Sequence, residues 1–152
     1  MTQSMGIAGG IGFFAEVCDE GRRFACHAGA DAAERLWQKP GPKLILIAGL
    51  GCSGRAWVGD PQQFVVEGRM PPQHQGLLAC QSLVRNYRWV AFFEYPSANA
   101  VDGAAILGKL CEAMRQAQPD DRIDMVGHSM GGLVTRCFVE LGNGHRVVDN
   151  AV

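Results

Sequence analysis

The sequence predicts an α/β fold: a mostly parallel sheet with helices on both of its faces. Three short apolar runs are typical of buried parallel strands: Lys43–Ile47, Arg88–Phe93 and Ile123–Val126. Segments with helical periodicity alternate with these runs, which indicates a parallel sheet joined by right-handed crossovers. At 152 residues, 47% of them hydrophobic, the chain is long enough to bury a core and is expected to form one domain.

The regions on either side of these strands have weaker signals. Gly12–Cys26 is predicted to form two short strands around the turn Asp19-Glu20-Gly21. Ala30–Gln38 is predicted to be a short polar helix or a loop, which Lys39-Pro40-Gly41-Pro42 ends. At the other end of the chain, Arg146–Val152 could begin a further strand.

Three segments have the apolar spacing of amphipathic helices. Gln75–Asn86 predicts a helix of about three turns. Asp102–Gln118 predicts a clearer helix, with Asp102 as its N-terminal cap. Met130–Leu141 predicts the third, and Gly142-Asn143-Gly144 provides a strong stop signal after it.

Composition and charge argue against several classes of function. The formal net charge of -1 provides no global field for nucleic acid or an anionic membrane. The longest apolar stretch, Leu44–Leu50, is far too short to span a bilayer. The six cysteines include no Cys-x-x-Cys pair and no histidine at metal-ligand spacing. We therefore expect no metal, no cofactor, no nucleic-acid partner and no transmembrane segment.

The scattered cysteines also bear on the cellular compartment. They favour buried free thiols in a reducing, cytoplasmic environment. The alternative is a short N-terminal signal peptide, because Met5–Ala15 is apolar. However, no basic residue precedes this stretch, and Glu16 and Asp19 follow it directly, which is not typical of a secretory leader.

One motif carries recognisable chemistry. Gly127-His128-Ser129-Met130-Gly131 matches the nucleophile-elbow pattern G-x-S-x-G and lies directly between a predicted strand and a predicted helix. A serine on so tight a turn must take a strained backbone conformation, and side chains at the flanking glycines would collide with the strand and the helix. The motif predicts Ser129 as a nucleophile, with Gly127, His128 and Gly131 completing the elbow.

A glycine-rich turn after the first parallel strand fits the same chemistry. An acyl-transfer enzyme needs donors for the oxyanion, usually backbone N–H groups. One is expected from Met130, directly after the nucleophile, and the other from Leu50 in the turn at residues 48–51, Ala48-Gly49-Leu50-Gly51. An ordinary left-handed turn is the alternative interpretation, and the elbow favours the oxyanion role.

Three stretches resemble the corresponding parts of the α/β-hydrolase superfamily: KLILIAGLGCSGRAW, RWVAFFEYP and IDMVGHSMGGLVTR. The resemblance runs from about Gly12 to Leu141 and is closest to lipases, esterases and thioesterases with a Gly-His-Ser-Met-Gly-Gly elbow. It implies hydrolysis of a small-molecule or lipid acyl ester or thioester. Ser129 would be the nucleophile, and the Leu50 and Met130 amides would form the oxyanion hole.

The sequence departs from the superfamily pattern in two loops. Many relatives begin the oxyanion turn with His-Gly, whereas this chain has Ala48-Gly49. The backbone donor survives that change, but the hydrogen bonds by which the histidine supports the loop are lost. In addition, Glu94-Tyr95-Pro96-Ser97 lacks the acidic-arginine-glycine pattern of many members.

The acid and the histidine of a catalytic triad are also missing. In this superfamily they follow the serine in the order acid, then histidine. After Ser129 the chain contains one histidine, His145, which precedes Asp149 and lies beyond a helix about 18 Å long. We therefore predict that residues 1–152 form a partial domain, truncated after the nucleophile helix, with the triad acid and histidine outside this chain.

Two alternatives remain open. The chain could be a catalytically inactive remnant that binds a partner or dimerises, because a sheet ending at Ile123–Val126 would leave an exposed edge for self-association. A dinucleotide site is the other alternative, since Gly49, Gly51 and Gly54 have G-x-G-x-x-G spacing. Against it, Gly59 would interrupt the helix that must follow, and no acidic residue ends a strand about 20 residues later.

Overall fold

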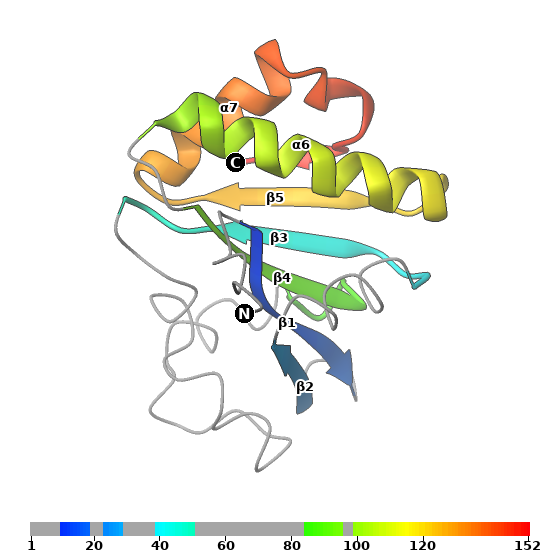
Figure 1. Cartoon of the computed structure of the whole chain (residues 1–152). Helices are drawn as coiled ribbons and strands as arrows, with labels where there is room; N and C mark the ends of the chain where they lie inside the picture. The colour runs from blue at the N-terminus through cyan, green and yellow to red at the C-terminus, as the bar shows by residue number, and fades with distance from the viewer. Residues whose placement is uncertain (1–9, 19–22, 29–38, 51–83, 96–98) are drawn as a thin grey trace, which may run out of the picture.

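The computed structural model describes residues 10–18, 23–28, 39–50, 84–95 and 99–152. Within these residues six strands form one sheet in the order β2-β1-β4-β3-β5-β6 (Figure 1). The strands are β1 (Gly10–Cys18), β2 (Arg23–Ala28), β3 (Lys43–Ile47), β4 (Trp89–Glu94), β5 (Ile123–Gly127) and β6 (Asn150–Ala151). The helical elements are α6 (Ala100–Ala117), α7 (Met130–Leu141) and the short 3₁₀ helix η2 (Gly144–Arg146).

The pairing of the strands is compatible with the predicted α/β class and gives a mixed sheet, with parallel strands on one side and antiparallel strands on the other. Strands β4, β3, β5 and β6 run parallel to one another, and β1 runs antiparallel to both β2 and β4. The antiparallel β1–β2 pair confirms the predicted N-terminal strands. Their predicted turn at Asp19-Glu20-Gly21, the Ala30–Gln38 segment and most of the predicted helix Gln75–Asn86 lie outside the described residues.

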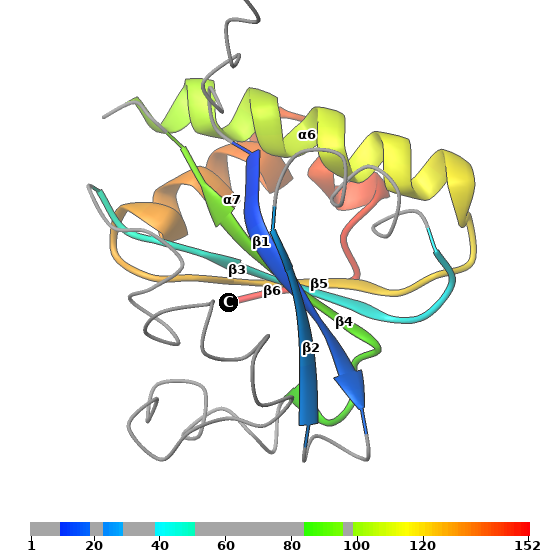
Figure 2. The ribbon, with the colours of Figure 1, turned by 60° about the horizontal axis from the view of Figure 1, so that its bottom comes forward.

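Continuous apolar strands are explained by burial on both faces of the sheet. Helices α6 and α7 both cover the same face (Figure 2), where Ile45 and Ile47 of β3 join a core with side chains of both helices. On the opposite face Leu44, Leu46 and Phe92 are equally buried. The predicted helices on both faces are thus seen on one face only among the described residues, while strands β3 and β4 are buried on both of their faces.

Helix α6 begins earlier than the sequence predicted. Its N-terminal cap is Asn99, whose side chain accepts a hydrogen bond of 2.9 Å from the backbone N–H of Val101. The prediction of Asp102 as the cap was wrong, because Asp102 lies inside the first turn. A carboxylate there still interacts favourably with the positive end of the helix dipole.

The C-terminal edge of the sheet is also different from the prediction. Strand β5 is not an edge strand, because β6 pairs with it in parallel, with Asn150 opposite Asp124 and Ala151 opposite Met125. The backbone N–H of Gly127 extends this pairing by donating to the Val152 carbonyl at 2.8 Å. Among the described residues the edge strand is therefore β6, which confirms a strand start within residues 146–152.

A cluster around Asp124 joins the beginnings of β4, β5 and β6. The buried Asp124 carboxylate accepts hydrogen bonds from the Tyr87 hydroxyl (2.5 Å) and the Asn150 amide (2.9 Å), and it pairs with Arg122. Burial opposes the charge on Asp124, but these hydrogen bonds outweigh it and hold its pKa below the usual value. Burial and the bond to Asp124 raise the pKa of Tyr87 to about 12.

A buried lysine lies at the same end of the sheet. The Lys43 ammonium donates to the carbonyls of Lys39 and Gly41 and forms an ion pair of 2.7 Å with Asp121. Burial lowers the pKa of Lys43, and the Asp121 carboxylate opposes that shift. Both clusters stabilise the starts of the strands and lie away from the elbow, which follows the end of β5.

Two cysteines in the described part of the chain are free thiols. Cys111 is a buried free thiol and Cys137 is a half-buried one. Burial raises the pKa of the Cys111 thiol, which keeps it protonated and unreactive. No helix in the described part of the chain combines the length and the apolar character needed to cross a membrane.

Candidate active site

Ser129 lies on a strained turn between a strand and a helix. Strand β5 ends at Gly127 and α7 begins at Met130, so only two residues connect them. Ser129 has φ 56° and ψ -122°, and Asn143 is the only other non-glycine residue with positive φ among those described. Such a conformation costs a non-glycine residue about 1–3 kcal/mol, and strain of this kind is concentrated at functional sites.

The flanking glycines are required by close approaches of the backbone. A Cβ atom on Gly127 would lie 2.5 Å from the carbonyl oxygen of Gly131. A Cβ atom on Gly131 would lie 2.3 Å from the Ile47 carbonyl oxygen and 2.7 Å from that of Ala48. Any side chain at these two positions would force β3, β5 and α7 apart.

The elbow is in direct contact with the glycine-rich turn that follows β3. Gly49 is buried, and a Cβ atom there would lie 3.3 Å from the Cβ of Ser129 and 3.4 Å from the His128 carbonyl oxygen. The backbone N–H of His128 donates to the Ile47 carbonyl at 3.1 Å, which joins the two segments. The structure therefore brings together two motifs that are about 80 residues apart in the chain.

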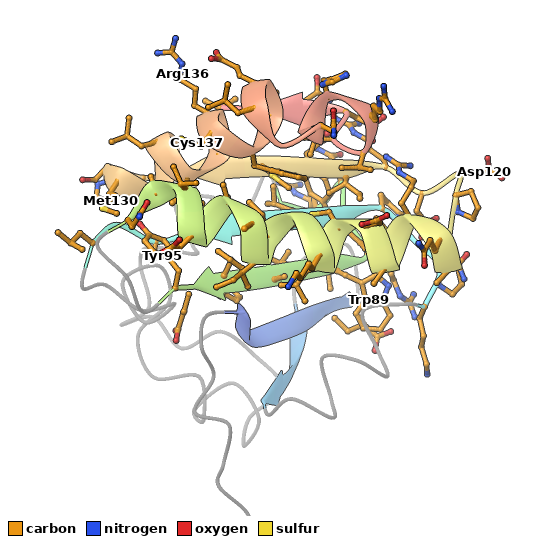
Figure 3. The ribbon with its side chains drawn as sticks, turned by 45° about the horizontal axis from the view of Figure 1, so that its top comes forward. Trp89, Tyr95, Asp120, Met130, Arg136 and Cys137 are labelled. Carbon is orange, nitrogen blue, oxygen red and sulfur yellow. The ribbon has the colours of Figure 1, made fainter. Side chains whose placement is uncertain are left out.

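The two expected oxyanion donors lie on these two segments. Met130 is the first residue of α7, where backbone N–H groups have no acceptor within the helix and the dipole favours negative charge. Leu50 follows Gly49 directly and is 57% exposed. Figure 3 shows Met130 and Tyr95 at one end of the sheet, and Trp89 and Asp120 at the other. Gly51, the last residue of the predicted turn, lies outside the described residues.

The structure does not bring His145 to Ser129. His145 is exposed in η2, beyond the C-terminal end of α7, whereas Ser129 precedes the N-terminal end of that helix. Twelve helical residues separate them by about 18 Å at 1.5 Å per residue. His128 is exposed within the elbow, and its Nδ1 lies 3.5 Å from the Cβ position of Gly49.

Tyr95 is a residue of this region that sequence reasoning gave no role. It directly follows β4, and its hydroxyl donates a hydrogen bond of 2.9 Å to the carbonyl oxygen of Ala48. Its ring packs against α6, where a Cβ atom on Gly103 would lie 3.3 Å from the Tyr95 Cγ. The available signal was a tyrosine after a buried strand, which does not specify the distant carbonyl that it contacts.

The site combines a presented hydroxyl, a helix N-terminus and a turn with backbone amides. These groups suit attack on an acyl carbonyl. Within the described ranges, no group of three or more His, Cys, Asp or Glu side chains is placed to hold a metal ion. Comparison of the chain with protein-family models, curated proteins and solved structures found no match.

Proposed function

We propose that this chain carries the nucleophile and the oxyanion turn of a serine hydrolase that cleaves a carboxylic ester or thioester. The observation that chiefly supports the proposal is the strained backbone of Ser129 against Gly49. A conformation that costs free energy needs a reason, and presentation of a hydroxyl beside backbone donors is one. The superfamily resemblance of the sequence points to the same chemistry.

The proposed reaction has two acyl-transfer steps. The Ser129 hydroxyl attacks the acyl carbonyl while a histidine from outside this chain takes its proton. The Leu50 and Met130 amides stabilise the oxyanion, which then collapses to an acyl-enzyme as the protonated histidine gives its proton to the leaving alcohol or thiol. Water attacks the acyl-enzyme in the second step, releases the acid and restores Ser129.

Exposed apolar side chains support an apolar acyl group in the substrate. Leu50 adjoins Gly49, and Leu133 lies in the first turn of α7, where side chains lean toward the helix N-terminus. Both are 57% exposed. An acyl chain bound beside Ser129 would cover these surfaces, which is in keeping with a lipid or other apolar ester.

Ester and thioester turnover tests the proposal. The protein made from the complete reading frame, including any residues after Val152, is assayed with nitrophenyl esters and acyl thioesters of increasing chain length. We expect turnover that Ser129→Ala lowers by at least about 10³-fold and that Cys137→Ala leaves unchanged, which controls for thiol reactivity. The 152 residues alone should show none, because a serine without a base stays protonated. Turnover that survives Ser129→Ala would contradict the proposal.

The inactive remnant is a second candidate. It is supported by the edge strand β6, whose two residues, Asn150 and Ala151, are exposed. A second copy pairing along β6 would cover these groups. Sedimentation of the 152-residue chain tests this candidate, and a monomer at all concentrations would exclude self-association through the edge.

A further inference from the structure

Both backbone polar groups of Ala48 are held by β4 and the residue that follows it. The Ala48 N–H donates to the Phe93 carbonyl at a long 3.4 Å, and the Ala48 carbonyl accepts the Tyr95 hydroxyl at 2.9 Å. The same carbonyl faces the start of α7, since a Cβ atom on Gly131 would lie 2.7 Å from it. Tyr95 therefore bonds to the turn at the point where the turn contacts the elbow helix.

The Tyr95 ring is itself fixed from two sides. It stacks on Phe93 with ring centroids 6.1 Å apart and an interplanar angle of 27°. It also packs tightly against Gly103 in α6, where a Cβ atom would lie 3.3 Å from the Tyr95 Cγ and 3.4 Å from its Cδ2. The hydroxyl is thus a well-positioned donor, because the ring that carries it has little freedom to turn.

The hydrogen bond from Tyr95 to Ala48 matters because the next residue, Gly49, is a glycine. A side chain on Gly49 would press against Ser129 and His128, with its Cβ atom 3.3 Å from the Ser129 Cβ. Glycine also permits far more backbone conformations than other residues. Only the two dihedral angles of Gly49 separate the peptide plane held by Tyr95 from the plane that carries the Leu50 amide. Fixing the Ala48 carbonyl therefore removes much of the freedom of the oxyanion donor.

We infer that Tyr95 is a positioning residue that holds the turn Ala48–Leu50 in register with Ser129. The anchoring follows from the contacts alone, whereas its consequence for catalysis rests on the proposed hydrolase function. Tyr95 acts through the Ala48 carbonyl and needs no contact with the substrate. It supports the turn from the residue directly after β4, through its hydrogen bond to the Ala48 carbonyl.

The chain offers a matched control, because it has only two tyrosines. Tyr87 also donates its hydroxyl to a single oxygen, that of Asp124, but it precedes β4, whereas Tyr95 follows it. Tyr95→Phe and Tyr87→Phe each remove one hydroxyl and keep the ring. A general loss of stability should appear in both variants, and a local effect on the turn only in Tyr95→Phe.

The test is ¹⁵N NMR of the 152-residue chain and both variants. We expect Tyr95→Phe to shift the amide signals of Gly49 and Leu50 and to lower their order parameters toward about 0.6, the flexible range. The amides of Leu44–Leu46 should not change, nor should the turn in Tyr87→Phe. Unchanged turn amides in Tyr95→Phe, or equal changes in both variants, would overturn the inference.

A kinetic measurement in the complete-reading-frame protein tests the consequence for catalysis. We expect Tyr95→Phe to lower kcat by about tenfold to hundredfold with little change in KM, because a small displacement of a catalytic donor has effects of this size. Tyr87→Phe should leave both constants unchanged. The NMR result does not depend on turnover, so failure of the hydrolase proposal and failure of the anchoring are distinguishable.

Discussion

Gly49 and Ser129 approach so closely that a Cβ atom on Gly49 would lie 3.3 Å from the Cβ of Ser129. Gly49 lies in the turn that follows β3, and Ser129 lies between the end of β5 and the start of α7. Because β3 and β5 are neighbours in the sheet and run parallel, their following turns emerge at the same edge. The topology therefore explains how two short motifs, distant in the sequence, form one site.

The elbow glycines provide a matched pair for stability measurements. A Cβ atom on Gly131 would meet a backbone oxygen at 2.3 Å, whereas one on Gly132 has its nearest contact at 3.7 Å. We expect Gly131→Ala to lower the free energy of unfolding by about 3 kcal/mol, as overpacking does. Gly132→Ala should be neutral or stabilising by up to about 1 kcal/mol, because alanine favours the helix. Urea unfolding measures both, and equal effects would contradict the packing described for Gly131.

The backbone strain at Ser129 predicts a difference in stability between two substitutions at this position. Glycine adopts a positive φ without a steric penalty, whereas alanine has a Cβ atom and keeps the penalty that serine has. We expect Ser129→Gly to be more stable than Ser129→Ala by about 1 kcal/mol in urea unfolding, despite the greater flexibility of glycine in the unfolded chain. A Ser129→Ala variant that is as stable as Ser129→Gly would show that the turn is not strained.

The Asp124 cluster predicts a dependence of stability on acid pH. The pKa of Asp124 is lower in the folded chain than in the unfolded one, so its contribution is present above the unfolded value and is lost as pH falls through the folded value. We expect Asp124→Asn to lower the free energy of unfolding at pH 7 by about 1–3 kcal/mol. The difference in free energy of unfolding between the wild type and Asp124→Asn should shrink below about pH 4. A difference that stays constant across this range would contradict the assigned role.

Tyr87 predicts the opposite dependence at alkaline pH. Its folded pKa is raised from 10.0 to about 12, so its contribution is present below the unfolded pKa and is lost as pH rises toward the folded one. The wild type should therefore lose its advantage over Tyr87→Phe between about pH 10 and pH 12. Unfolding measured across that range tests this, with the ultraviolet absorbance of the phenolate as an independent record of the titration.

The elements that the sequence predicted well are those with strong local signals. Lys43–Ile47 consists of one lysine followed by four apolar residues, and it forms a buried strand with the predicted bounds. Met130–Leu141 has helical periodicity after the elbow and a glycine-rich stop, and α7 has the same bounds. The contact of the elbow with the turn after β3 also follows from parallel pairing, once both motifs are placed at strand ends.

The features that the sequence did not predict depend on tertiary contacts. Asn99 precedes the periodic apolar residues of α6, so the pattern points to Asp102 rather than to Asn99 as the cap. The strand expected to begin within Arg146–Val152 is β6, but its bounds of Asn150–Ala151 are set by pairing with β5 rather than by a pattern of its own. The bond from Tyr95 to Ala48 joins residues 47 positions apart, and neither residue type indicates the other.

The most direct test of Ser129 as a nucleophile is covalent labelling by a fluorophosphonate, with the modified peptide identified by mass spectrometry. In the protein made from the complete reading frame, we predict one adduct on Ser129 that is absent in Ser129→Ala, and no adduct on the 152 residues alone. An unlabelled Ser129 in the complete protein, or labelling that persists in Ser129→Ala, would contradict the account.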